Sequence, residues 1–72
     1  MILNKGGDSV KINAAKFFGL CADRGLLLKD VCRIAGVGYP TLQKIRNGTP
    51  VRLDTVGRLA AALEVKSAEL MA

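Results

Sequence analysis

The 72-residue chain has no histidine, no tryptophan and only three aromatic residues. Because histidine is the commonest general base and the commonest metal ligand, its absence argues against an enzyme. The chain also lacks a glycine-rich phosphate loop of the GxxxxGK[ST] form. Cys21 and Cys32 stand eleven positions apart, without metal-ligand spacing. We therefore expect no catalysis, no metal or other cofactor, and no small-molecule ligand.

Long apolar runs are absent as well. No window approaches the roughly 20 apolar residues that a membrane-spanning helix needs, and the N-terminus lacks the apolar run of a signal peptide. These absences predict a cytoplasmic protein that does not enter a membrane. In that reducing environment we expect no disulfide between Cys21 and Cys32, and Cys32 is predicted to be a small buried hydrophobe.

The composition that remains favours helices. A chain of this length makes one small domain, which buries only about 60% of its unfolded surface. Half of the residues are hydrophobic, and they are mainly Leu, Val, Ile and Ala. Runs typical of strands are absent beyond the first dozen residues. The sequence therefore predicts an all-α fold.

Capping signals divide the chain into five short helices. Asn13 is a good N-cap, and Gly25, Gly36 and Gly48 stand where helices end in a left-handed residue. The predicted helices cover about residues 14–24, 29–35, 39–47, 53–63 and 68–71, and residues 49–51 are predicted to form a loop. Residues 1–11 are expected to form an N-terminal arm or a short hairpin, and residues 12–72 the helical domain.

Apolar spacing indicates which helix faces turn inward. In the second predicted helix, Val31, Ile34 and Ala35 repeat at helical spacing, and in the third Leu42 and Ile45 do so. The fourth carries an apolar face formed by Leu53, Val56, Leu59, Ala60 and Leu63.

The third helix also carries a polar face. Because Leu42 and Ile45 anchor it, Tyr39, Gln43, Lys44 and Arg46 must point elsewhere. An exposed aromatic hydroxyl, an amide and two cations suit the reading of DNA base edges.

Positive charge is concentrated around the second and third helices. The formal net charge is +5, and residues 28–52 hold five cations against a single acidic residue, Asp30. A positively charged patch of this kind is expected to bind a polyanion. Basic residues can also serve solubility alone.

The order of these signals resembles the Cro and phage-repressor type of helix-turn-helix domain, the xenobiotic-response-element family. The resemblance covers about residues 12–70. Its matching positions are Gly25, Val31-Cys32 in place of a Leu-Ala pair, Gly36-Val37, Thr41-Leu42, Ile45, Gly48, Thr55 and the run from Leu59 to Val65. The resemblance implies a compact five-helix fold like that of lambda repressor, with the helix-turn-helix at helices two and three.

Two positions depart from the family pattern. The family usually places a Gln that grips a backbone phosphate at the start of helix two, where this chain has Leu28. The free N–H groups at that helix end can still bind an anion. The family also often pairs an Arg in helix one with a Glu near the end of helix three, and here Cys21 and Arg46 stand there. Arg46 is then either an additional DNA contact or lies over apolar surface with its head in water.

The resemblance also implies which side chains touch DNA. Tyr39, Pro40 and Lys44 would contact base edges, and Thr41 would sit near a phosphate. The chemistry of the residues adds Gln43 as a base contact. Further phosphate contacts are expected from Lys29, Asn47, Thr49 and Arg52.

The function that these features favour is sequence-specific binding of double-stranded DNA by a transcriptional regulator of the repressor type. Residues 39–47 would lie in the major groove, and a homodimer is expected because one small domain makes few base contacts. Leu28, Ala61, Ala62 and Met71 are not needed by the core and are candidates for the subunit contact. The alternative is a protein-interaction module, such as an antitoxin-like or co-regulator protein, with Tyr39 as a hot-spot residue.

Overall fold

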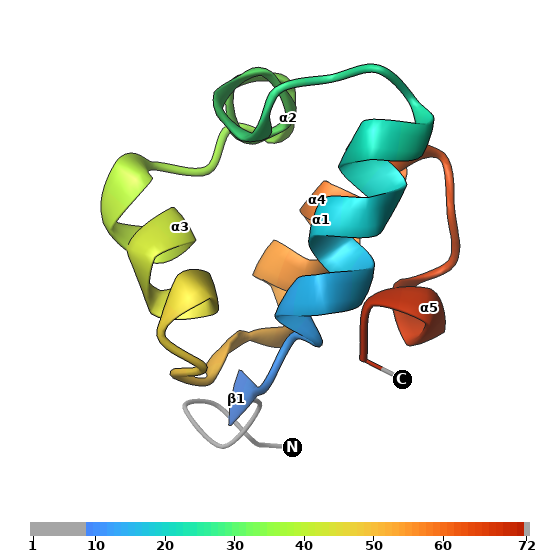
Figure 1. Ribbon diagram of the computed structural model, residues 1–72. Helices are drawn as coiled ribbons and strands as arrows, with labels where there is room; N and C mark the ends of the chain where they lie inside the picture. The colour runs from blue at the N-terminus through green and yellow to red at the C-terminus, as the bar shows by residue number, and fades with distance from the viewer. Residues whose placement is uncertain (1–8, 72) are drawn as a thin grey trace.

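The computed structural model describes residues 9–71. Five helices and two very short strands follow one another along this part of the chain (Figure 1). Their bounds are β1 Ser9–Val10, α1 Ala14–Asp23, α2 Leu28–Ala35, α3 Tyr39–Arg46, β2 Val51–Arg52, α4 Leu53–Leu63 and α5 Ser67–Met71. The prediction of a five-helix fold is confirmed, and each helix boundary lies within one residue of its predicted place.

The helix ends follow from local chemistry. The Asn13 side chain accepts a hydrogen bond from the backbone N–H of Lys16 at 3.1 Å, which caps α1. Gly36 ends α2 in the left-handed region, with φ of 73°, and Gly48 follows α3 with the same φ. Pro40 lies in the first turn of α3, where its missing N–H does no harm.

The two strands correct the prediction that residues 49–51 form a plain loop and that strands are absent beyond the first dozen residues. Val51–Arg52 pairs antiparallel with Ser9–Val10, and Val10 lies opposite Val51. Val51 is buried, so burial of its side chain stabilises the pairing. Residues 1–8, which make up most of the predicted arm or hairpin, lie outside the described residues.

The core lies where α1, α2, α4 and α5 meet, with α3 added at one side. α2 and α5 pack against α4, and α1 packs against α5. The fully buried side chains with the largest volumes are Phe17, Ile45, Leu59, Leu63, Leu70, Val31, Val56 and Cys21. Burial of these side chains is the main stabilising term of so small a domain.

Two predicted core residues are exposed. Ile34 is 59% exposed, because the buried stripe of α2 runs through Leu28, Val31, Cys32 and Ala35. Since successive helix residues are rotated by about 100°, Ile34 lies to the side of that stripe. Leu53 is 44% exposed, because it is the first residue of α4 and precedes the buried turn that Val56 begins.

Two contacts join segments that are far apart in the sequence. The Arg24 guanidinium pairs with the Glu64 carboxylate at 3.0 Å, which joins the end of α1 to the end of α4. The backbone N–H of Asn13 donates to the carbonyl of Leu70 at 2.7 Å. None of the helices in the described residues has the length and apolar character needed to cross a lipid bilayer.

Candidate nucleic-acid interface

α2 and α3 meet at a tight turn that projects one end of α3 away from the core. Gly36 ends α2, and the N–H of Val37 donates to the Cys32 carbonyl at 2.8 Å. Gly38 then takes an extended conformation as the N-cap of α3. Figure 1 shows α3 at the edge of the molecule, away from α1.

α3 presents one face to the core and another to solvent. Leu42 and Ile45 are 3% and 1% exposed, whereas Tyr39 is 63% exposed. Pro40 and Lys44 are also exposed. The structure therefore places these three predicted base-contact residues on an accessible surface.

Gln43, the fourth predicted base-contact residue, has an intramolecular partner. Its amide Nε2–H donates to the Tyr39 hydroxyl at 3.0 Å, one helical turn earlier. Gln43 is only half-buried, so the pair lies at the surface of α3.

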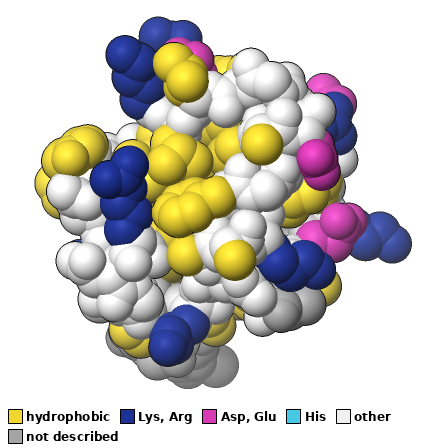
Figure 2. Space-filling model, in the orientation of Figure 1, with side chains coloured by type: hydrophobic (Ala, Val, Ile, Leu, Met, Phe, Trp, Pro, Cys, Tyr) yellow, Lys and Arg dark blue, Asp and Glu magenta, His cyan; other side chains and the backbone are white. Residues whose placement is uncertain are grey.

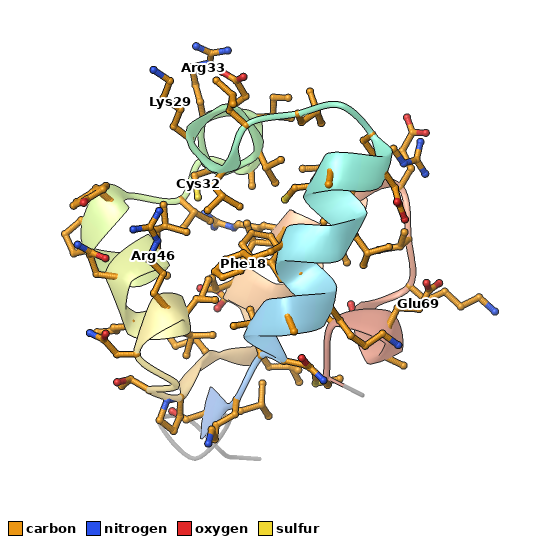
Figure 3. The ribbon with its side chains drawn as sticks, in the orientation of Figure 1. Phe18, Lys29, Cys32, Arg33, Arg46 and Glu69 are labelled. Atoms are coloured by element: carbon orange, nitrogen blue, oxygen red, sulfur yellow. The ribbon has the colours of Figure 1, made fainter. Side chains whose placement is uncertain are left out.

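A small hollow adjoins Tyr39 where α2 meets α3. Its volume is about 190 Å³, and it is lined by Lys29, Cys32, Arg33, Val37, Tyr39 and Leu42. Lys29 and Arg33 are exposed at its rim, and Figure 3 shows both side chains extending outward from α2. The hollow thus joins the cations of α2 to the exposed end of α3.

The predicted phosphate contacts occupy several segments. Lys29 is exposed in the first turn of α2, and Asn47 and Thr49 are exposed after α3. Thr41 is half-buried in α3. Arg52 is the N-cap of α4, and its Nε lies 3.4 Å from an Asp54 carboxylate oxygen. Because an exposed ion pair of this kind contributes little, Arg52 remains available to a phosphate.

Three helix N-termini in this region lack a side-chain cap. In contrast to α1, the structure shows no side-chain hydrogen bond at the N-caps of α2, α3 and α4. The first N–H groups of an uncapped helix, together with the helix dipole, favour an anion.

The electrostatics of this region are dominated by cations without acidic partners. Lys29, Lys44 and Arg46 form no ion pair within the part of the chain that the structure describes, whereas Arg33 pairs with Asp30 at 3.1 Å. Figure 2 shows Lys and Arg side chains spaced around an apolar area on the face seen in Figure 1.

The two cysteines do not add reactive chemistry. Both are free and buried. Burial raises the pKa of the Cys21 thiol, and the nearby charge of Cys32 raises it further. Burial likewise raises the pKa of the Cys32 thiol. Both are thus neutral thiols near pH 7, and residues 9–71 contain no cluster of three or more Cys, Asp or Glu side chains able to hold a metal.

A model of the Cro/C1-type helix-turn-helix DNA-binding domain matches residues 19–72. The chain belongs to this family. It is therefore a DNA-binding transcription regulator with a helical, lambda-repressor-like fold. The search of curated proteins finds no match, and neither does the search of solved structures.

The first departure from the helix-turn-helix pattern has a structural consequence. Leu28, at the place of the family's phosphate-gripping Gln, is half-buried and packs against the core. An apolar side chain donates no hydrogen bond, so Leu28 cannot grip a phosphate as the family's Gln does.

The second departure concerns the missing pair between helix one and helix three. Cys21 is buried, and the Arg46 side chain is exposed and lies over α3 in Figure 3. An ion pair between Arg24 and Glu64 ties α1 to α4 instead. A DNA contact by Arg46 stays a prediction.

Sequence reasoning did not place Lys11 near the end of α3. The Lys11 side chain lies beside Gly48, which follows α3, and its ammonium nitrogen is 3.8 Å from the position that a Cβ atom on Gly48 would occupy. The pairing of β1 with β2 brings Lys11 there. No local pattern could have found it, because the two residues are far apart in sequence.

Proposed function

We propose that this domain binds double-stranded DNA sequence-specifically as a repressor-type regulator, with residues 39–47 in the major groove. The observation that carries the proposal is the division of α3 between buried Leu42 and Ile45 and exposed Tyr39, Pro40 and Lys44. A helix anchored on one side and polar on the other fits the major groove.

Each exposed side chain suits a part of a base edge. The Lys44 ammonium can donate to O6 and N7 of guanine, and the Tyr39 hydroxyl can donate or accept. Pro40 has no donor and offers apolar contact, such as with a thymine methyl group. Together they distinguish base pairs, and the proposed function includes no catalytic step.

Phosphate contacts would fix the position of the domain on the duplex. We assign them to Lys29, Thr41, Asn47, Thr49 and Arg52, which lie on or beside α2, α3 and the start of α4. Contacts of this kind set register and supply affinity without reading sequence.

We further propose that the domain acts as a homodimer. Two copies on a near-palindromic site would place their α3 helices about 34 Å apart, one turn of DNA. Exposed apolar side chains away from α3 support this, since Leu27, Ile34 and Met71 are 61%, 59% and 39% exposed. Sedimentation of the free and DNA-bound protein tests it, and a monomer in both states would contradict it.

Selection of binding sites from random duplexes tests the main proposal. We expect an enriched motif and an affinity that falls by about 0.9 log units per log unit of salt for each phosphate neutralised. Arg52→Ala should weaken binding to all sequences alike and lower that slope by about one unit. Lys66→Ala, in the turn between α4 and α5, is the matched control and should change neither.

Failure to enrich a DNA motif would favour the alternative that the domain binds another protein. A chain that retains no duplex at low salt is not the regulator proposed here. A protein partner held by apolar anchors around Tyr39 would show only a weak response to salt.

A further inference from the structure

A hydrogen bond joins Tyr39 and Gln43 on the exposed face of α3. The chain contains one tyrosine and one glutamine, and they stand one helical turn apart. The Gln43 Nε2–H donates to the Tyr39 hydroxyl oxygen at 3.0 Å. Tyr39 is 63% exposed, so its ring is accessible to a ligand while its oxygen is held by Gln43.

With the Gln43 amide oriented as in this structure, the bond uses a lone pair of the Tyr39 hydroxyl oxygen. A phenol oxygen carries one hydrogen and accepts through its lone pairs. The amide nitrogen of glutamine donates only, so it cannot take the phenol hydrogen. Among residues 9–71, the structure shows no other hydrogen-bond partner for the Tyr39 hydroxyl. The hydrogen of Tyr39 therefore remains available to a ligand.

We propose that Gln43 is a positioning residue that makes the Tyr39 hydroxyl a hydrogen-bond donor toward DNA. This inference rests on the proposed function, and it states which partner donates the hydrogen bond between Tyr39 and a base. Tyr39 then selects a base that presents an acceptor in the major groove: guanine through O6 or N7, thymine through O4, or adenine through N7. Cytosine presents only its N4 amino donor there, so it is disfavoured at that position. Gln43 thus acts through Tyr39 and contacts no base itself.

The test is a variant that reverses the direction of the hydrogen bond between residues 43 and 39. In Gln43→Glu, a carboxylate replaces the amide and can only accept, so it takes the phenol hydrogen in a short charge-assisted bond. The Tyr39 oxygen is then left as an acceptor toward DNA. Random-site selection with this variant should shift the preference at one position to cytosine or adenine, whose amino groups donate. Selection with the unchanged protein should disfavour cytosine there by about tenfold, the effect of one unsatisfied hydrogen bond.

Two further variants separate positioning from contact. Tyr39→Phe removes the hydroxyl and should abolish the preference at that same position. Gln43→Met keeps the length of the side chain without its amide, and it should weaken the preference there without reversing it. Preferences are compared within each variant at one salt concentration, so a general loss of affinity from the added negative charge of Gln43→Glu cancels.

The outcomes distinguish this inference from the proposed function. If the unchanged protein selects no motif, the proposed function fails and this inference fails with it. If it selects a motif, Tyr39→Phe alters one position and Gln43→Glu leaves that position unchanged, only the inference is overturned.

A measurement without DNA provides a second check. Because each residue is the only one of its type, nuclear Overhauser contacts between the Gln43 amide protons and the Tyr39 ring can be assigned without ambiguity. We expect these contacts in the free protein, and their absence would overturn the positioning role.

Discussion

α1 and α3 are helices of similar length in the same small domain, yet their polar groups are used differently. The N-terminus of α1 is capped by Asn13, and Arg24 at its end pairs with Glu64 of another segment. α3 begins without a side-chain cap, and the side-chain hydrogen bond shown for it joins two of its own residues. Lys44 and Arg46 form no ion pair within the described residues.

This difference separates stability from binding. The Asn13 cap stabilises α1 and is engaged within the protein. Polar groups without partners in the protein contribute little to folding, but they can bind an outside molecule. α1 is therefore expected to affect the free energy of unfolding, and α3 to affect DNA recognition.

The largest effect is expected from Phe17→Ala in α1. Phe17 is fully buried, and truncation of a buried aromatic ring destabilises by about 3–5 kcal/mol. One core in so small a domain rarely supplies more than about 3–5 kcal/mol, so urea unfolding followed by circular dichroism should find this variant largely unfolded. Tyr39→Ala in α3 is the matched aromatic control and should stay within about 0.5 kcal/mol of the unchanged protein. Equal destabilisation by the two variants would remove the distinction between the helices.

Lys44→Ala should show the converse behaviour. Its free energy of unfolding should change by less than about 0.5 kcal/mol, because Lys44 is exposed and has no ion pair in the described region. Discrimination at one base pair should fall by about 1–3 kcal/mol, as measured by competition with single-substituted duplexes. Lys66→Ala serves as the control, and an equal effect of the two lysines would show that Lys44 supplies only charge.

Two asparagines allow a smaller and closely matched comparison. Asn13→Ala removes the cap of α1 and should lower the free energy of unfolding by about 0.5–2 kcal/mol, while the folded fraction keeps its DNA preference. Asn47→Ala, after α3, should weaken DNA binding with little change in thermal unfolding. If Asn47→Ala leaves DNA affinity unchanged, its assignment as a phosphate contact is wrong.

The smallest effect near neutral pH is expected from the buried thiols. Burial raises the pKa of Cys21 and of Cys32 in the folded state. The unfolded chain therefore loses its thiol protons first as pH rises above about 8.5, and stability falls from there until the folded thiols also ionise. Below that range the contribution is fully present. Urea unfolding from pH 7 to pH 10 should show a shallower decline in the double variant Cys21→Ala, Cys32→Ala, and identical declines would contradict the assignment.

Much of the fold was predictable because its signals are local. Asn13, Gly36 and Gly48 mark helix ends through bonds and backbone angles that involve only neighbouring residues. The inward turn of Leu42 and Ile45, and with it the exposure of Tyr39, follows from helical periodicity. The prediction for Ile34 was wrong because the buried side of α2, which packs against α4, is centred on Val31 and Cys32 and leaves Ile34 beside it.

The sequence by itself determined five helices, their ends and the two-faced character of α3, since caps, glycines and side-chain spacing act within one or two helical turns. Only the tertiary structure decided that β1 joins β2, that Lys11 lies beside Gly48, and that Arg24 meets Glu64, 40 residues later. Those contacts depend on how the helices pack. The packing is fixed by side-chain burial across the whole core, and no local sequence pattern specifies it.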